Sequence, residues 1–284
     1  FGFNSGLRID CKQINADAYG YSKLFPAFNK SYGIFFKQNN HIVRLTYSGS
    51  YRAPHLSELF TNGLHHGTMR FEIGDTNLDI EKSHQFDIKY QWSNDHVGFV
   101  INPFMQFVHD FIAINPIDSL YNNTYRIYRY TQFNQVKMSG FEFNLHYHPH
   151  FLHNLHFEQS YAFIRALNQD NDTFLALTPS NQIKTRLNLD LTSYRIPIGL
   201  KSFNIYHIYS FSQENVAQYE LATSAYSVLN IELCFNPFKN FNFNVSVNNL
   251  LNQEYVPHLS RIKDVAQGVP NPGRSFNLSL KYDF

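Results

Sequence analysis

Charged residues are few in this chain, and the two signs nearly cancel. Only 16% of the 284 residues are charged, with 23 Lys and Arg against 22 Asp and Glu. A near-neutral chain offers no basic field for nucleic acid, so we expect no nucleic-acid partner. Cysteine is scarce as well, and the distant pair Cys11 and Cys234 cannot form a disulfide framework.

Long apolar runs and catalytic motifs are also missing. No stretch of about 18 apolar residues occurs, which excludes a membrane-spanning helix. The chain has no G-x-S-x-G, H-E-x-x-H or C-x-x-C and no glycine-rich phosphate loop. We therefore expect no enzyme and no covalently bound cofactor. The chain opens at Phe1 without Met and without an apolar signal segment, so we expect a processed product or a fragment.

Aromatic residues are abundant instead, with 28 Phe, 19 Tyr and 1 Trp. So many aromatics demand an apolar surrounding, which excludes a disordered chain. Apolar and polar residues alternate with a period of two, as in the last segment of the chain: Phe276, Leu278, Leu280, Tyr282 and Phe284 are separated by polar residues. A period of two is typical of β-strands, whose successive side chains point to opposite faces.

This alternation predicts an all-β chain with about twelve strands in a single domain, residues 1–284. We expect the strands near 2–10, 26–37, 41–51, 82–93, 96–112, 126–147, 153–166, 179–191, 198–211, 223–235, 241–250 and 273–284. Short links alternate with long ones, which we expect at 11–25, 52–81, 113–125, 167–178, 212–222 and 251–272. An antiparallel up-and-down β-barrel, with tight turns at one end and long loops at the other, has this rhythm.

Alternation alone leaves open which face of the strands is dry. A soluble, secreted β-sandwich that binds carbohydrate would bury its apolar face, whereas a transmembrane barrel turns that face to lipid. Charges in mid-strand, such as Lys184, favour the transmembrane barrel because a water-filled lumen accepts them. We expect Leu187, Leu189, Phe243, Val245, Leu278 and Leu280 to face lipid, and Arg186, Asn188, Asn244 and Lys281 to face the lumen.

Three motifs carry a resemblance to a known family. They are Tyr51-Arg52-Ala53-Pro54 with Glu58-Leu59-Phe60, then Gly74-Asp75 with Asn77-Leu78 and Glu81-Lys82-Ser83, and last Asn248-Asn249-Leu250 with Pro272-Gly273-Arg274 before the final Phe284. In this order and spacing they resemble TonB-dependent receptors of Gram-negative outer membranes. A barrel-type outer-membrane enzyme, considered as an alternative, would need a Ser/His/Asp constellation that we do not find.

The resemblance implies a fold, a location and partners. Such receptors have an N-terminal plug domain and a 22-stranded barrel, so the twelve strands would be the C-terminal part, with the plug absent. Whether they close alone or pair with a missing part stays open. The implied surroundings are the bacterial outer membrane and its lipid, and the implied partners are TonB and the plug domain in the full-length parent. The barrel assembly machinery would read the final strand through its apolar residues: Phe276, Leu278, Leu280, Tyr282 and Phe284.

Histidine is unusually frequent, at 14 residues, and imidazole is the commonest protein ligand for transition metals. The stretches 57–74 and 258–264 resemble loops of the zinc-uptake branch of these receptors. The resemblance implies ligand binding by extracellular loops through His65, His66, Glu72, His258 and Asp264, with His65, His66 and His258 as metal ligands. The implied function is uptake of a scarce nutrient, zinc or another metal or metal chelate. A haem or siderophore receptor is the alternative, and so is a purely structural role for these histidines.

Two further expectations concern the histidines. Adjacent strand residues face opposite ways, so His65 and His66 reach one ion only if the loop bends, which Gly63 and Gly67 permit. A second group surrounds a short turn and comprises His146, His148, His150 and His153. We interpret this second group as polar residues of a solvated turn at the periplasmic rim.

Overall fold

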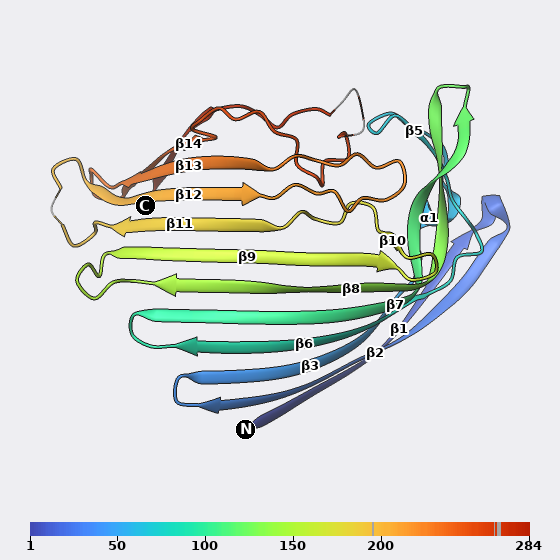
Figure 1. Cartoon of the computed structure of the whole chain (residues 1–284), viewed down its shortest axis with the longest axis horizontal. Coiled ribbons are helices and arrows are strands. Elements are labelled where there is room, and N and C mark those ends of the chain that lie inside the picture. Colours follow the sequence, from blue (N-terminus) through green and yellow to red (C-terminus); the bar gives the residue numbers. More distant parts are fainter. Residues whose placement is uncertain (195, 264, 266–267) are drawn as a thin grey trace.

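The computed structural model describes residues 1–194, 196–263, 265 and 268–284, and Figure 1 shows a broad curved sheet. Twelve strands form its main path. They are β1 Gly2–Ala16, β2 Tyr21–Gln38, β3 His41–Arg52, β6 Glu81–Ser93, β7 Val97–Tyr121, β8 Tyr125–Tyr147, β9 Leu155–Asn168, β11 Gln182–Asp190, β12 Leu200–Ser210, β13 Tyr226–Phe235, β14 Phe241–Asn248 and β15 Ser275–Tyr282. Each overlaps one predicted range, so the predicted strand set is confirmed.

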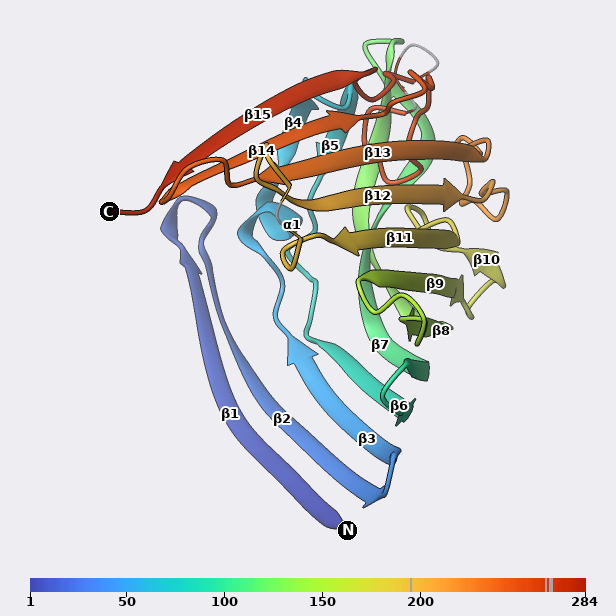
Figure 2. The same cartoon turned by 90° about the vertical axis from the view of Figure 1, so that its left-hand side faces the viewer.

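The strands of this path lie in chain order, and every neighbouring pair is antiparallel. The up-and-down topology is therefore confirmed. All strands of the described residues belong to one sheet, so a sandwich of two sheets is wrong. Strands β1 and β15 lie at the two edges and do not pair with each other within the described part of the chain. Figure 2 shows the sheet bent into an arc between these edges.

The strand register sorts side chains into rows that run across the sheet. One row joins apolar residues of five consecutive strands: Leu187, Ile205, Ile231, Val247 and Phe276. The row beside it is polar: Asn188, Asn204, Glu232, Ser246 and Asn277. Since neighbouring rows point to opposite faces, the two residue sets predicted from the alternation lie on opposite faces of the sheet.

The polar face is the inner, concave one. Lys12 and Phe25 are paired across β1 and β2, and Lys12 Nζ donates to the carbonyl oxygen of Pro54 at 2.8 Å. Phe25 is only 1% exposed and packs in a cluster with Leu59 and Leu78. Leu59 and Leu78 belong to residues 53–80, which we call the inner segment, and they pack on Phe25 of the sheet. Figure 2 shows α1 (Leu56–Phe60) and β4 (Asn62–His65) of this segment inside the arc.

Two of the predicted long links are wrong. The link 11–25 is mostly strand, because β1 and β2 continue to a short turn containing the 3-10 helix η1 (Asp17–Tyr19). The link 113–125 is the outer part of the β7–β8 hairpin, which ends in a tight turn at 122–124. Polar residues and Pro116 break the alternation there. This part of the hairpin extends past the neighbouring strands, so neither of its faces has to be apolar. The register shifts between Pro116 and Leu120 mark a bulge in the same stretch.

The remaining elements are short and lie between the long strands. Strand β5 (Arg70–Ile73) pairs with β4 and, in parallel, with β8, while β10 (Thr173–Phe174) pairs with β9. Among the described residues, none of the helices has the length and apolarity that crossing a membrane requires. Cys11 and Cys234 are free thiols, as the sequence predicts.

Candidate functional site

The long-loop end of the sheet is built on an ion-pair network made by the sequence motifs. Arg52, at the end of β3, contacts both carboxylate oxygens of Glu58 at 2.9 and 3.0 Å, and its Nε donates to Glu81. Glu81 also accepts the backbone N–H of Ile112 at 2.6 Å. Four elements, β3, α1, β6 and β7, are thereby tied together at one point. Sequence reasoning singled out these motifs but gave this network no role.

Gly74 brings the end of the inner segment against α1. A Cβ placed there would lie 2.6 Å from the carbonyl carbon and 2.7 Å from the carbonyl oxygen of Leu59. The backbone N–H of Asp75 donates to the carbonyl oxygen of Glu58 at 3.0 Å in the same contact. Lys23 Nζ reaches the carbonyl oxygen of Leu78 at 3.1 Å from the sheet. The inner segment is therefore held at both ends and packs against the polar face of the sheet.

The β4–β5 hairpin is part of the inner segment and carries two predicted ligands. His65 ends β4, His66 follows in the turn, and both are exposed. His65 Nδ1 lies 3.0 Å from the hydroxyl oxygen of Thr68. The bend between the strands uses Met69, with φ of 51°, where sequence reasoning assigned the freedom to Gly63 and Gly67. A tight turn needs one left-handed residue, and its position does not follow from composition.

Glu72 shares a face of this hairpin with His65, because His65 pairs with Arg70 and Gly63 with Glu72. The carboxylate of Glu72 is buried and accepts from Arg70 Nε at 2.7 Å. The guanidinium of Arg70 lies 4.8 Å from the ring centroid of Tyr128 in β8. Glu72 therefore holds Arg70 in place against the sheet.

A buried ion-pair group joins three of the long loops, and we call it the loop clamp: Glu220, His258 and Lys263. Lys263 Nζ lies 2.5 Å from Glu220 Oε1, and His258 Nε2 lies 3.3 Å from the same oxygen. Glu220 also accepts the backbone N–H of Leu177 at 2.8 Å and of Ala217 at 3.0 Å. The clamp thus links the β9–β11, β12–β13 and β14–β15 connections.

The contacts of Glu220 decide its charge. Burial by itself would raise the pKa of this carboxyl group, but hydrogen bonds from His258, Lys263 and two backbone N–H groups outweigh it. The pKa falls from an ordinary 4.5 to about 2, so Glu220 is ionised at neutral pH. His258 is only 2% exposed, and its Nδ1 lies 3.0 Å from the hydroxyl oxygen of Thr223.

The predicted ligand residues are therefore distributed over separate places. His65 and His66 stand on the exposed hairpin, Glu72 is paired with Arg70, and His258 is enclosed in the loop clamp. Asp264 lies outside the described residues. Within the described part of the chain, the groups of three side chains close enough to share a metal ion comprise other histidines. Glu220 and Lys263 were missed because one charged residue in each of two distant loops gives no sequence signal.

The final strand and the polar face complete the picture. On β15, Phe276 and Leu278 are 75% and 72% exposed and lie on the outer, apolar face. A hollow of about 480 Å³ lies over strands β6 to β12, and Lys184, Arg186 and Glu158 are among its lining residues. Arg186 Nη1 lies 3.5 Å from Glu158, and Arg186 also stacks over Tyr206 at 5.3 Å.

Comparison with known proteins places the sheet in a family. A family model described as TonB dependent receptor-like, beta-barrel, matches residues 1–250. Among solved structures, the copper transporter OprC superposes with a TM-score of 0.78 at 16% identity, over 99% of this chain and 45% of that chain. The FrpB iron transporter from Neisseria meningitidis (F3-3 variant) gives a TM-score of 0.73 at 18% identity, over 99% of this chain and 42% of that chain.

A third similar structure is the siderophore receptor PirA from Acinetobacter baumannii. It gives a TM-score of 0.68 at 18% identity, over 91% of this chain and 41% of that chain. At these identities the likeness shows the fold. The chain spans less than half the length of the structures it matches.

Proposed function

Because this chain belongs to the family of TonB-dependent receptor β-barrels, we propose that it forms the C-terminal barrel portion of an outer-membrane receptor for a scarce metal, either free or chelated. Zinc is the metal we propose before any other. The family is one of receptors and transporters rather than enzymes, and its barrels lie in the bacterial outer membrane. The work we assign is binding and gated passage, with no bond made or broken. TonB, the plug domain and the barrel assembly machinery are the partners proposed for the complete receptor.

One observation carries this proposal: the division of the sheet into a polar inner face and an apolar outer face. The outer rows, such as the one through Leu187 and Phe276, suit lipid. The inner rows carry Lys184, Arg186 and Glu158, which a water-filled passage accepts without a desolvation penalty. The inner segment and the loop clamp lie at one end of that face, where a cargo would enter.

Zinc is favoured as cargo by the exposed hairpin tip. His65 and His66 are exposed, so an ion in solution can reach their imidazole nitrogens. Neutral imidazole is a preferred zinc ligand. Glu72 could join them only by leaving Arg70, and we assign His258 to the loop clamp. Asp264 stays a candidate from the last loop. The similar structures are named for copper, iron and siderophore transport, so the proposed cargo class is shared with them.

The test is the initial rate of zinc uptake by zinc-starved cells that carry the complete receptor. Loss of a second-shell partner alone costs about 10–100-fold in metal affinity, so replacing both direct ligands, His65→Ala/His66→Ala, should slow uptake at low zinc by at least about 10-fold. His41→Ala, an exposed histidine at the opposite end of the sheet, is the matched control. Equal uptake by the double variant would overturn zinc capture by this hairpin and move the assignment to a siderophore or haem chelate, whose uptake is then measured in the same cells.

A further inference from the structure

Six histidines gather at the short-turn end of the sheet, opposite the loops discussed above. His96 lies in the β6–β7 turn, and the β8–β9 connection with its flanking strand ends contributes five more: His146, His148, His150, His153 and His156. The backbone N–H of His148 donates to the carbonyl oxygen of His96 at 2.9 Å, which ties the two turns together. Sequence reasoning found four of the six, because His156 lies within the predicted strand 153–166 and His96 joins the others only through the fold.

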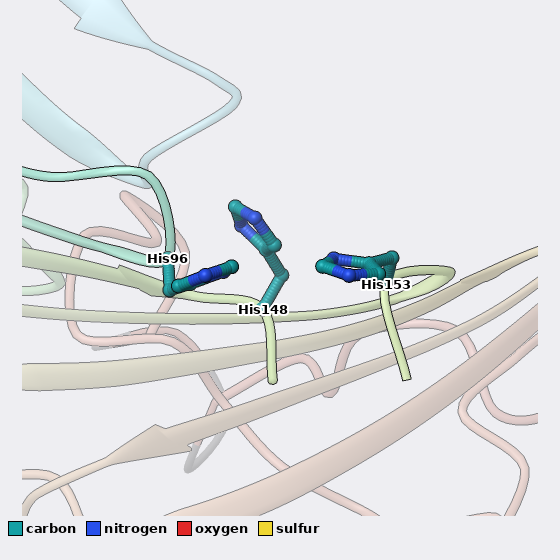
Figure 3. A group of neighbouring side chains, drawn as sticks. All are labelled: His96, His148 and His153. Carbon is teal, nitrogen blue, oxygen red and sulfur yellow. The ribbon is translucent and has the colours of Figure 1, made fainter. Parts of the chain in front are cut away.

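Five of these side chains form two sets of three with ligand atoms in close reach. His96, His148 and His153 make one set, drawn in Figure 3, and His146, His148 and His156 make the other. Within each set the candidate nitrogen atoms lie within 4.8 Å of one another. Zinc bonded to nitrogen at about 2.0–2.1 Å in a tetrahedron needs nitrogens about 3.4 Å apart. His156 Nδ1 and His146 Nε2 are already 3.3 Å apart, and small side-chain rotations bring in the others.

The surroundings keep ligand nitrogens available. Nδ1 of His96 and Nδ1 of His148 are buried and have no hydrogen-bond partner among the described residues. An unpartnered buried nitrogen costs free energy that a bound cation would recover.

We propose that this histidine cluster binds one zinc ion, or a similar divalent transition-metal ion, through three imidazoles and water. Three nitrogen ligands with one open position form a familiar zinc geometry. The number is one because both sets share His148, and a neutral imidazole has a single lone-pair nitrogen. The two sets are therefore alternative positions for the same ion.

The position of the cluster gives the two sets different access. His146 also lines the hollow on the sheet, together with Glu158 and Arg186. His96 and His153 lie in the turns, at the rim of the sheet. An ion that changes sets by keeping His148 moves from the edge of the hollow to the rim. This inference stands whether or not the cargo bound by the loops is zinc.

The test is a zinc titration of the complete receptor in detergent, with a chromogenic chelator as competitor. The His65→Ala/His66→Ala variant is the background, so zinc bound to the loop hairpin does not contribute and failure of either proposal is seen separately. We expect one zinc per chain. His148→Ala should weaken binding by about 100-fold or more, because it removes a ligand from both sets.

The single variants separate shared from unshared ligands. His96→Ala and His156→Ala should each weaken binding by less than about 10-fold, because one intact set remains, whereas the double variant should match His148→Ala. His150→Ala is the matched control, because His150 lies in the same turn, 5.1 Å from His96 by ring centroids, and in neither set. Heat-modifiable migration on gels checks folding, and cobalt substitution reports nitrogen ligands by its visible spectrum. Unchanged binding in His148→Ala, or an equal loss in His150→Ala, would overturn the proposal.

Discussion

At the scale of single residues, the loop end depends on a few charged groups that the fold takes out of water. Glu220 receives four donors from three connections, and Arg52 joins the carboxylates of Glu58 in α1 and Glu81 at the start of β6. Removing one partner of such a buried group leaves a charge without compensation, which costs more than the pair itself contributes. Each of these residues therefore ties several segments together at the loop end.

The loop clamp makes the loops sensitive to acid. The folded pKa of Glu220 is about 2 against 4.5 for an ordinary glutamate, so the ionised carboxylate stabilises the closed loops fully above about pH 4.5. That contribution is lost as pH falls from 4.5 toward 2. Glu220→Gln should open the loops already at pH 7, at a cost of about 3 kcal/mol. Hydrogen exchange of peptides from 212–225 and 251–263 measures this opening.

Glu254 provides the control for that experiment, since it is an exposed glutamate in the last of the clamped loops. Glu254→Gln should leave exchange unchanged at pH 7. Protection in Glu220→Gln equal to that of the wild type would mean that the carboxylate does not hold the loops.

At the scale of elements, each strand has an apolar face suited to lipid and a polar face suited to water, and β15 shows this most clearly. Its apolar residues Phe276 and Leu278 are largely exposed, whereas Asn277 and Ser279 point to the other face. Neighbouring residues of one strand therefore report on two different surroundings. The predicted assembly signal consists of the apolar set, and its role in assembly stays a prediction.

A charge on the apolar face of β15 should impair membrane assembly. Leu278→Arg places a cation toward lipid, which costs up to about 2–4 kcal/mol near the bilayer midplane. Ser279→Arg, one residue along on the inner face, is the matched control and should be tolerated. The amount of folded complete receptor in isolated outer membranes is compared by heat-modifiable migration. Similar amounts for the two variants would count against a lipid-facing β15.

Strands were predicted well from the sequence where the alternation of apolar and polar residues was long. A strand segment with both faces in water was mistaken for a loop. Rows such as Leu187 to Phe276 follow from period-two patterns alone. The outer part of the β7–β8 hairpin did not, because neither face is buried and Pro116 looked like a breaker. The loop clamp could not be predicted, since it joins residues from separate connections. Of the six-histidine group, four were grouped from the sequence, but His96 comes from a different turn. Motif residues such as Arg52 and Gly74 were found, but their partners became visible only in three dimensions.

At the scale of the whole molecule, the described sheet has two free edges, β1 and β15. A row of unpaired backbone N–H and C=O groups is costly in lipid and prone to pair with other chains in water. The edges therefore need partner strands before the sheet can stand in a membrane.

Residues 1–284 produced alone should consequently fail to form a closed, detergent-stable barrel. We expect aggregation, and no heat-modifiable band, whereas the complete receptor gives one. Size-exclusion chromatography in detergent with gel migration measures the difference. A monomeric, heat-modifiable product from residues 1–284 would show that these strands close by themselves.

The order of the strands also bears on how the sheet is made. The strands of the main path lie in the sheet in the same order as in the chain. Most pairings therefore join segments that are close in sequence. Short loops close quickly and at low entropic cost. The sheet can therefore grow one hairpin at a time, with β7 and β8 as its longest ladder. In a complete up-and-down barrel, β15 would pair with the first strand of the barrel, which is distant in the chain, so we expect closure at β15 to be the slow step of folding.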